Sequence, residues 1–305
     1  MLKASFIAFS QSKFLRSLAE KTAIGQRLSR RFVAGFSVDD VLLASRAMNQ
    51  IGLSVSVDNL GENVTNVEEA RQSAQLYHQL LEQMHQQKLN ANISLKLTHM
   101  GLDVDESLAL ELTSGLVRHA VAVDNFVRVD MEGSAYTDKT LAFVHCLHGN
   151  AGFEQRVGAV IQSYLHRSEK DVEQLVAKHI RIRLCKGAYK EPPEIAFEKK
   201  ADVDANYVKL MKVLLKSGVY HGIATHDEKM IHATIEFARK EQIAAEWFEF
   251  QMLYGVRRDL QKKLVKEGWR CRVYMPFGTE WYPYFMRRLA ERPANAIFIL
   301  KNLFQ

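Results

Sequence analysis

The segment Ile-Arg-Ile-Arg-Leu-Cys at residues 180–185 is a short run rich in β-forming residues, and such runs predict strands. The chain continues with Asp-Ala-Asn-Tyr-Val-Lys-Leu-Met-Lys-Val-Leu-Leu-Lys-Ser at residues 204–217, where apolar positions recur at helical spacing. Gly218 follows and is placed to cap the C-terminus of this helix. The run Gly-Ile-Ala-Thr at residues 222–225 then predicts a second strand. A strand, a helix and a strand in this order form a βαβ unit, in which the two strands are parallel.

The same alternation extends outward along the chain. Another helical segment, residues 257–267, ends at Gly268. Eight candidate strands are present, at residues 53–58, 92–97, 126–130, 158–162, 180–185, 222–225, 247–250 and 272–274. Eight strands that alternate with helices predict an α/β fold, a (βα)8 barrel of the TIM type, for which about 250 residues is typical. A doubly wound open sheet is the structural alternative.

The predicted barrel takes up residues 51–305, and residues 1–50 are predicted to form an N-terminal helical segment that packs on it or flanks it. Residues 1–36 hold seven basic residues and one acidic residue, whereas the rest of the chain holds 34 of each. A basic segment interleaved with Phe and Leu is typical of an amphipathic helix. Such a helix either contacts an anionic membrane surface or caps the domain, and both interpretations stay open.

The composition is that of a soluble globular protein, with 47% hydrophobic and 25% charged residues among 305. Three widely spaced cysteines, Cys146, Cys185 and Cys271, argue against a disulfide framework and favour a reducing compartment. We therefore expect a cytoplasmic protein, attached peripherally at the inner face of the cell membrane if the basic segment binds lipid. Because the surplus positive charge is confined to that segment, we expect no nucleic-acid partner.

Polar and charged residues stand at nearly every predicted strand end, where a barrel carries its active site. They are Asp58, Glu62, Lys96, Asp130, Glu132, Gln162, Arg183, Lys186, Thr225, His226, Glu249, Gln251 and Tyr274. Burying so many polar groups without a functional reason would cost free energy, so their convergence predicts an active site.

Several common catalytic signatures are absent. The chain has no GxGxxG after a first strand, no GxxxxGK[ST], no HExxH and no GxSxG. His145 and His148 are the one histidine pair with ligand-like spacing, and we interpret them as helix-surface residues, so we assign no metal.

Two constellations are distinctive. The first is Arg-Leu-Cys-Lys-Gly-Ala-Tyr at residues 183–189, a strand that enters a glycine turn with a cation on each side. The second is Tyr-Phe-Met-Arg-Arg-Leu-Ala-Glu at residues 284–291, in the predicted last helix. Paired guanidinium groups above a barrel mouth suggest a small carboxylate substrate.

Further motifs accompany them at the strand ends: Ile-Ser-Leu-Lys-Leu-Thr at 93–98, Val-Arg-Val-Asp-Met-Glu at 127–132, Ala-Thr-His-Asp at 224–227, Phe-Glu-Phe-Gln at 248–251 and Tyr-Met-Pro-Phe-Gly at 274–278. Together, over residues 52–300, these motifs closely resemble the proline dehydrogenase family in its short, monofunctional bacterial form. The resemblance implies a distorted (βα)8 barrel that binds FAD without a Rossmann motif. It also implies oxidation of L-proline to Δ1-pyrroline-5-carboxylate by hydride transfer from C5 to flavin N5, the first step of proline catabolism to glutamate, with a quinone as electron acceptor.

The resemblance also implies roles for individual residues. Asp130 and Arg183 are the expected catalytic residues, with Asp130 bonded to Tyr274 and Arg183 near the flavin. The expected substrate-binding residues are Glu62, Lys96, Tyr274, Tyr284, Arg287 and Arg288. The expected FAD contacts are Met131, Gln162, Lys186, Gly187, Ala188, Thr225, His226 and Glu291. The chain departs from the commoner family pattern at Phe277 and at residues 292–295, and neither change touches an expected catalytic group.

Three alternatives stay open. A hydroxyproline-preferring dehydrogenase differs only in pocket shape, which the sequence does not determine. A lyase or aldolase on the same fold would use Lys96 or Lys186 as a Schiff-base nucleophile. A non-catalytic barrel that binds carboxylates is the third.

Overall fold

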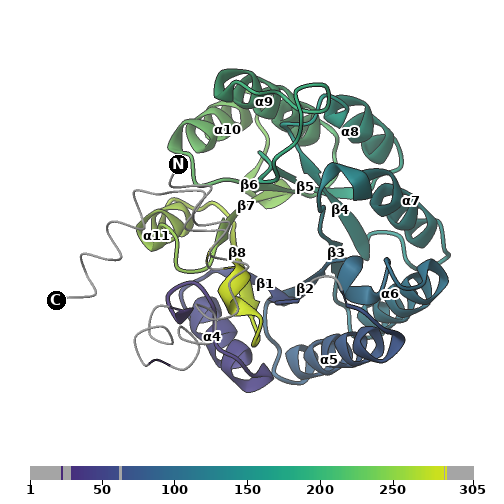
Figure 1. Cartoon of the computed structure of the whole chain (residues 1–305). Helices are drawn as coiled ribbons and strands as arrows, with labels where there is room; N and C mark the ends of the chain where they lie inside the picture. Colours follow the sequence, from purple (N-terminus) through teal and green to yellow (C-terminus); the bar gives the residue numbers. More distant parts are fainter. Residues whose placement is uncertain (1–21, 23–28, 62–63, 285, 287–305) are drawn as a thin grey trace.

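The computed structural model describes Thr22, residues 29–61, residues 64–284 and Met286. Eight parallel strands hydrogen-bond in sequence order and close into a barrel, with β1 paired to β8 (Figure 1). The strands are β1 Ser54–Asn59, β2 Ala91–Leu95, β3 Val127–Val129, β4 Val157–Gln162, β5 Arg181–Cys185, β6 His221–Ala224, β7 Phe248–Leu253 and β8 Cys271–Phe277. The closed barrel confirms the predicted TIM-type fold and excludes the open sheet.

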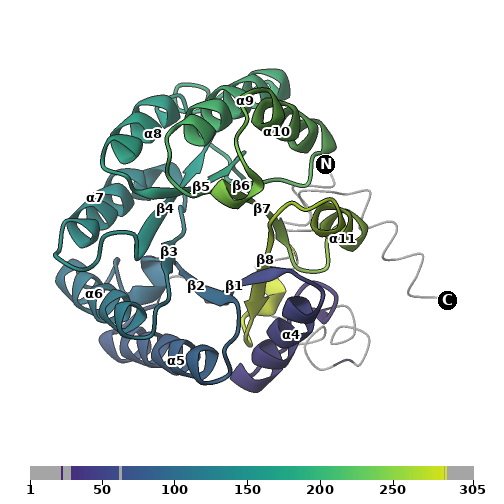
Figure 2. The ribbon, with the colours of Figure 1, turned by 180° about the vertical axis from the view of Figure 1, so that it is seen from behind.

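The helices form a ring around the barrel, as both faces show (Figures 1 and 2). They are α4 Val38–Gln50, α5 Val67–Gln86, α6 Glu106–Ala122, α7 Thr137–His148, α8 Ser168–Ala177, α9 Lys200–Lys216, α10 Glu228–Lys240 and α11 Arg258–Lys266. Short 3-10 turns are η1 Thr98–Met100, η2 Ser134–Tyr136 and η3 Ala245–Trp247. No helix in the described part of the chain is long and apolar enough to cross a bilayer.

The place between β8 and β1 in the outer ring is taken by α4, which precedes the first strand. In a regular (βα)8 barrel, a helix that follows the last strand would lie there. Here the residues just after β8 pack elsewhere: Trp281 and Tyr284 form a separate apolar cluster with Phe32 and Leu60. The position of α4 between β8 and β1 is therefore a departure from the regular barrel.

Local sequence accounts for many helix ends. Ser37 and Asp40 form a capping box at the start of α4, and Asp227 caps α10. Gly218 and Gly268 follow α9 and α11 with φ of 71° and 86°, the left-handed conformation that ends helices, as predicted.

Side chains alternate along each strand. The apolar residues, such as Ile182 and Leu184 of β5, are buried in the core cluster between sheet and helices. The intervening residues, such as Arg181 and Arg183, belong to the polar contacts that cross the barrel interior. The interior of this barrel therefore carries hydrogen-bonded and charged side chains on several strands, and its largest apolar core lies outside the sheet.

All eight predicted strands are present, with boundary shifts. The largest concern the last two: β7 begins at Phe248 and extends to Leu253, and β8 continues to Phe277. Trp247, predicted to start β7, instead lies in η3 and is 54% exposed. Both strands are longer than predicted because each pairs with a neighbouring strand to its end. In β8, the low β propensity of Pro276 also hid the continuation.

Candidate active site

A buried network joins three of the predicted site residues at the carboxyl ends of the strands. Arg183 Nη1 donates to Asp130 Oδ1 at 2.7 Å, and the Tyr274 hydroxyl donates to Asp130 Oδ2 at 2.8 Å. Ser94 Oγ also donates to Asp130 Oδ1, at 2.6 Å. Four strands thus contribute to one charged cluster, since Asp130 directly follows β3. The predicted link between Asp130 and Tyr274 is present.

Arg183 is held on several sides. Its Nη2 donates to Ser56 Oγ at 3.1 Å, its Nη1 also donates to Ser94 Oγ at 3.1 Å, and its Nε donates to Gln251 Oε1. The guanidinium carbon lies 5.1 Å from the centre of the Tyr274 ring, a cation–π distance. These contacts fix the plane of the guanidinium group inside the barrel.

Lys96 follows β2 and forms a second ion pair, with its Nζ 3.1 Å from Asp58 Oδ2. Burial raises the pKa of Asp58; the Lys96 ammonium opposes that rise and the Asp130 carboxylate adds to it. Tyr77 donates to the Ser94 carbonyl at 2.9 Å beside this pair. The interior thus brings together the carboxylates of Asp58 and Asp130 and the cations of Lys96 and Arg183.

Tyr274 is a hydrogen-bond donor in this setting. Burial, together with the negative charges of Asp130 and Asp58, raises the pKa of Tyr274 well above its ordinary value. Its hydroxyl therefore stays protonated and can order Asp130.

Most of the predicted cofactor residues lie at the carboxyl end of β4 or in the segments that directly follow the adjacent strands β5 and β6. Gln162 at the end of β4 donates to the Glu132 carbonyl at 3.0 Å, and His226 Nε2 accepts from the Leu253 amide at 2.9 Å. Thr225 is buried and its hydroxyl accepts from the Asp227 amide at 3.0 Å. Met131, from the segment after β3, is buried in the main core cluster.

The turn after β5 contains a glycine that packs against an aromatic ring. Gly187 has φ of 108°, and a Cβ placed there would lie 2.2 Å from Cδ1 of the Tyr164 ring. Tyr164 therefore makes one close approach that this glycine permits. An approach of the Gly187 backbone to a ligand stays a prediction. Ala188, next in the turn, is exposed.

Lys186 precedes that glycine and is paired with two carboxylates. Its Nζ lies 2.5 Å from Asp204 Oδ1 and 2.8 Å from Asp227 Oδ2. Despite burial, which acts in the opposite direction, hydrogen bonding to Lys186 contributes to a lowered pKa at both aspartates. This lysine is a component of an ion-pair cluster at the rim.

The remaining predicted residues are distributed differently. Tyr284 is buried and packs in the apolar cluster with Phe32, Leu60 and Trp281. Four others lie outside the described residues and stay predictions: Glu62, Arg287, Arg288 and Glu291.

Sequence reasoning placed Asp58 and Gln251 at strand ends without giving them a role, and it missed Ser56 and Ser94. A period of two would have found them, because polar residues stand two apart on the same strands, as in Ser56 and Asp58. The structure shows that such pairs contribute successive layers of side chains to one interior network.

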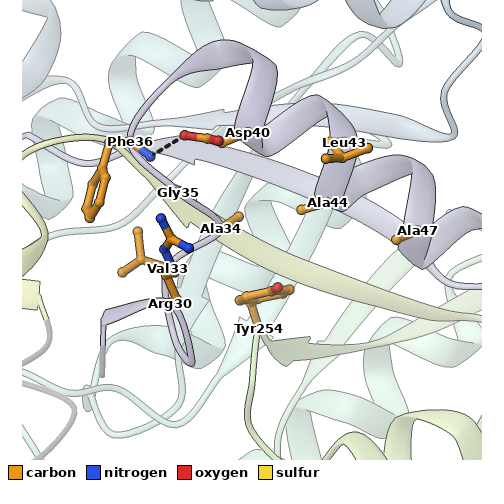
Figure 3. A pocket seen from close by; sticks show the side chains of 10 residues that line it. All are labelled: Arg30, Val33, Ala34, Gly35, Phe36, Asp40, Leu43, Ala44, Ala47 and Tyr254. Atoms are coloured by element: carbon orange, nitrogen blue, oxygen red, sulfur yellow. Dashed lines mark hydrogen bonds between the residues drawn. The ribbon is translucent and has the colours of Figure 1, made fainter. Parts of the chain in front are cut away.

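A groove of about 340 Å³ lies outside this network (Figure 3). It is lined by residues of the segment before α4, by α4 and by Tyr254 of the β7–α11 loop. Its acidic residue, Asp40, accepts hydrogen bonds from the Phe36 and Ser37 amides as part of the helix cap. The charged residues of its lining are Arg30 and Asp40, so the groove carries fewer charged groups than the barrel interior.

A closed parallel barrel with charged side chains gathered at the carboxyl ends of its strands is the organisation of the TIM-barrel enzymes. Comparisons with known proteins specify the class further. The family model described as "Proline dehydrogenase" matches residues 41–301. The chain is 41% identical to proline dehydrogenase 1 of Bacillus subtilis (strain 168), over the full length of both chains. It is 39% identical to the proline dehydrogenase of Deinococcus radiodurans, with 96% of this chain and 97% of that one covered.

Among solved structures, proline utilization A from Bdellovibrio bacteriovorus inactivated by N-propargylglycine superimposes with a TM-score of 0.82 at 26% identity. The match covers 88% of this chain and 33% of that longer one. The chain belongs to the proline dehydrogenase family.

Proposed function

We propose that this protein is an FAD-dependent oxidoreductase that oxidises L-proline to Δ1-pyrroline-5-carboxylate and passes the electrons to a quinone. The observation that carries the proposal is the buried network of Asp130, Arg183 and Tyr274 at the carboxyl ends of the strands. Family membership supports the same reaction.

Asp130 orders the reacting site in this proposal. It accepts from Tyr274, Arg183 and Ser94 at once, which holds the tyrosine ring and the guanidinium group in a fixed relation. A positive charge held at a fixed place in a buried site stabilises negative charge that develops beside it, with little reorganisation during the reaction. Arg183 would be the residue that does so.

The substrate carboxylate would be bound by Lys96, with Arg287 and Arg288 as further predicted ligands. Lys96 is suited to this role because its side chain is 12% exposed at the end of β2 and is held by Asp58. Holding the carboxylate at fixed cations would orient the ring and reduce the entropic cost of reaching a reactive geometry.

Arginine substitutions test this clamp. Replacing Arg287 or Arg288 with Ala should lower kcat/KM for L-proline about tenfold to a hundredfold, the scale of a hydrogen bond to a charged group. The Arg→Lys variants should be nearly as impaired, because lysine cannot form the bidentate fork. A loss smaller than about twofold in both Ala variants, measured by steady-state kinetics, would remove the arginines from the clamp.

The donor groups on β4 to β6 suit an FAD molecule. A dinucleotide presents phosphates, hydroxyls and ring heteroatoms, and the rim offers the Gln162 amide, the Thr225 hydroxyl, the His226 ring and the backbone of the turn at residues 186–188. When bound there, FAD would supply a two-electron acceptor for the substrate. Lys186 and its two aspartates would keep the turn after β5 in place.

The test is the visible spectrum of the purified protein under anaerobic conditions, before and after addition of L-proline. Flavin absorbance that bleaches with L-proline supports the proposal, and a parallel titration with hydroxyproline separates the two substrates. A protein that binds no FAD after reconstitution would refute it.

The ion pairs argue against the Schiff-base lyase. Such a reaction needs a lysine nitrogen that is available to attack a carbonyl carbon, whereas an ion pair holds the nitrogen against a carboxylate. Both candidate lysines have such neighbours: Lys96 has Asp58, and Lys186 has Asp204 and Asp227. Borohydride trapping with a keto acid should therefore leave the protein unlabelled.

Membrane contact through the basic N-terminal segment would bring the barrel to a lipid-soluble quinone. A truncated variant should keep residues 29–36, because this segment packs on the barrel: the Ala34 amide donates to the Pro276 carbonyl and Val33 is buried. Deleting residues 1–28, which contain five basic residues and one acidic residue, should weaken co-sedimentation with anionic vesicles. Unchanged co-sedimentation would refute membrane contact and favour the interpretation that the segment caps the domain.

A further inference from the structure

We infer that Gln251 is a positioning residue for Arg183, and that Glu249 and Arg272 fix Gln251 from the other side. The inference deepens the proposed function, on which it rests for the role of Arg183. It concerns a chain of hydrogen bonds that runs through the barrel from Arg272 on β8, by way of β7, to Arg183 on β5.

The chain has four members joined by direct contacts. Arg272 Nε donates to Glu249 Oε1 at 2.6 Å, and Gln251 Nε2 donates to the same oxygen at 2.7 Å. The Oε1 atom of Gln251 then accepts from Arg183 Nε. Gln251 and Glu249 are each 4% exposed, so water does not compete for these contacts.

The chemistry of the two neighbours determines which way the Gln251 amide points. A guanidinium group can only donate, and an ionised carboxylate can only accept. Although burial acts to raise the pKa of Glu249, the Arg272 charge and hydrogen bonds outweigh it and lower that pKa, so Glu249 is an acceptor at neutral pH. The amide oxygen of Gln251 must therefore face Arg183, and its NH2 group must face Glu249.

Gln251 completes the set of acceptors around Arg183. Asp130, Ser94 and Ser56 receive the two terminal nitrogens, and Gln251 receives Nε on the opposite side of the guanidinium group. Without Gln251, Arg183 Nε would have no side-chain acceptor at this position, and the guanidinium plane of Arg183 could rotate more easily. Small errors in the orientation of such a group are costly to the reaction.

The neighbouring strand makes room for this contact. Gly222 on β6 is paired with Glu249 in the sheet, and a Cβ at Gly222 would lie 2.3 Å from Gln251 Nε2. The φ of Gly222 is not in the left-handed region, so the backbone conformation does not call for glycine here. The missing Cβ instead leaves room for the Gln251 amide, which would have to move if residue 222 were larger.

A first experiment removes the contact and compares it with a matched control. Gln251→Leu should lower kcat with L-proline about tenfold to a hundredfold while KM changes less than about threefold. The control is Gln261→Leu, which removes another buried glutamine whose Nε2 donates to the Leu253 and Val256 carbonyls, away from Arg183. Equal losses of kcat in the two variants, or a loss below about twofold in Gln251→Leu, would overturn the inference.

A second experiment uses Gln251→Glu and pH. The protonated side chain of this variant reproduces the donor toward Glu249 and the acceptor toward Arg183, whereas its ionised form places two carboxylates side by side. Relative to wild type, kcat of Gln251→Glu should therefore recover as pH falls. A pH profile parallel to that of wild type would overturn the inference.

The same variant has a readout that needs no turnover. Two adjacent carboxylates share a proton with a raised pKa in the folded state, so the variant should lose thermal stability relative to wild type as pH rises. A difference in Tm that is constant with pH would show that residue 251 does not face Glu249. If wild type fails to bleach with L-proline, the proposed function fails, and this melting experiment still tests the contact.

Discussion

The barrel interior contains two buried ion pairs of similar geometry at two levels. Arg183 and Asp130 meet at 2.7 Å near the carboxyl ends of the strands, and Arg272 and Glu249 meet at 2.6 Å near their amino ends. Exposure does not separate them, because their side chains are 7% and 11% exposed in the first pair and 11% and 5% in the second. Position along the strand, and not burial, distinguishes the two pairs. The upper pair is expected to lie at the reaction, whereas the lower pair is expected to stabilise the fold and to affect the reaction only through Gln251.

The surroundings of the two pairs support this distinction. Arg272 also donates to the Val55 carbonyl, and Glu249 also accepts from the Tyr220 hydroxyl, so the lower pair ties strands together. The upper pair lies beside a second carboxylate, Asp58, and a second cation, Lys96. Closely spaced charges of both signs at the carboxyl ends suit a polar substrate. The charged neighbours of the lower pair are cations, Arg181 and Arg128, which interact with the Glu249 carboxylate.

The largest expected effect concerns the lower pair. Arg272→Leu would leave the Glu249 carboxylate buried without its cation, and we expect the free energy of unfolding to fall by about 3 to 5 kcal/mol. Urea unfolding at pH 7 measures this loss. The double variant Arg272→Leu with Glu249→Leu should recover part of the stability, because the Glu249 charge is removed together with that of Arg272. A single-variant loss below about 1 kcal/mol would contradict the folding role.

The next effect concerns the upper pair and should appear in catalysis. Asp130→Asn keeps the shape but removes the charge that holds Arg183 and Tyr274, and we expect kcat/KM for L-proline to fall about a hundredfold. Its stability cost should be less than half that of Arg272→Leu, because the Asp130 charge also repels Asp58 in the folded state. The assignment of Asp130 to catalysis would be wrong if Asp130→Asn lowered the free energy of unfolding by more than it raised the activation free energy calculated from kcat/KM.

The effect expected to be smallest per residue acts through pH and involves two buried histidines. Burial and the Lys96 charge lower the pKa of His99 to about 4, and burial with the Arg128 and Arg181 charges lowers that of His221 to about 3. Both histidines are thus neutral in the folded protein at pH 5, whereas in the unfolded chain they become protonated below a pKa of about 6.5. Stability should therefore fall as pH drops through about 6.5, by about 2 kcal/mol per histidine between pH 7 and pH 5.

Urea unfolding of wild type and His221→Asn across this range checks the effect. The Asn side chain can still accept from the Ile182 amide, as His221 Nδ1 does at 2.9 Å, but it does not titrate. The variant should lose about 2 kcal/mol less than wild type between pH 7 and pH 5. Identical slopes would mean that His221 is not buried as a neutral ring.

The sequence by itself determined the eight strands, the helices between them and most of the residue types at the carboxyl ends of the strands. Glu249 was predicted at such an end, but it stands near the amino end of β7 because that strand continues to Leu253. The strands and helices follow from local periodicity and from glycine at positions such as Gly218 and Gly268, which neighbouring residues alone specify. By contrast, the residues around Gly187 do not indicate that this glycine packs against the ring of Tyr164, which lies on another loop. The roles of Glu62, Arg287, Arg288 and Glu291 stay predictions drawn from family resemblance.

Only the tertiary structure decided which charges meet. Asp130 contacts Arg183 from 53 positions away and Tyr274 from 144 positions away, and no local pattern encodes such pairings. The closure of the barrel also placed α4 where a last helix is expected, and it turned Gln251 toward both Glu249 and Arg183. Sequence periodicity determines which face of a strand is polar, but the register and closure of the sheet determine which polar groups become neighbours.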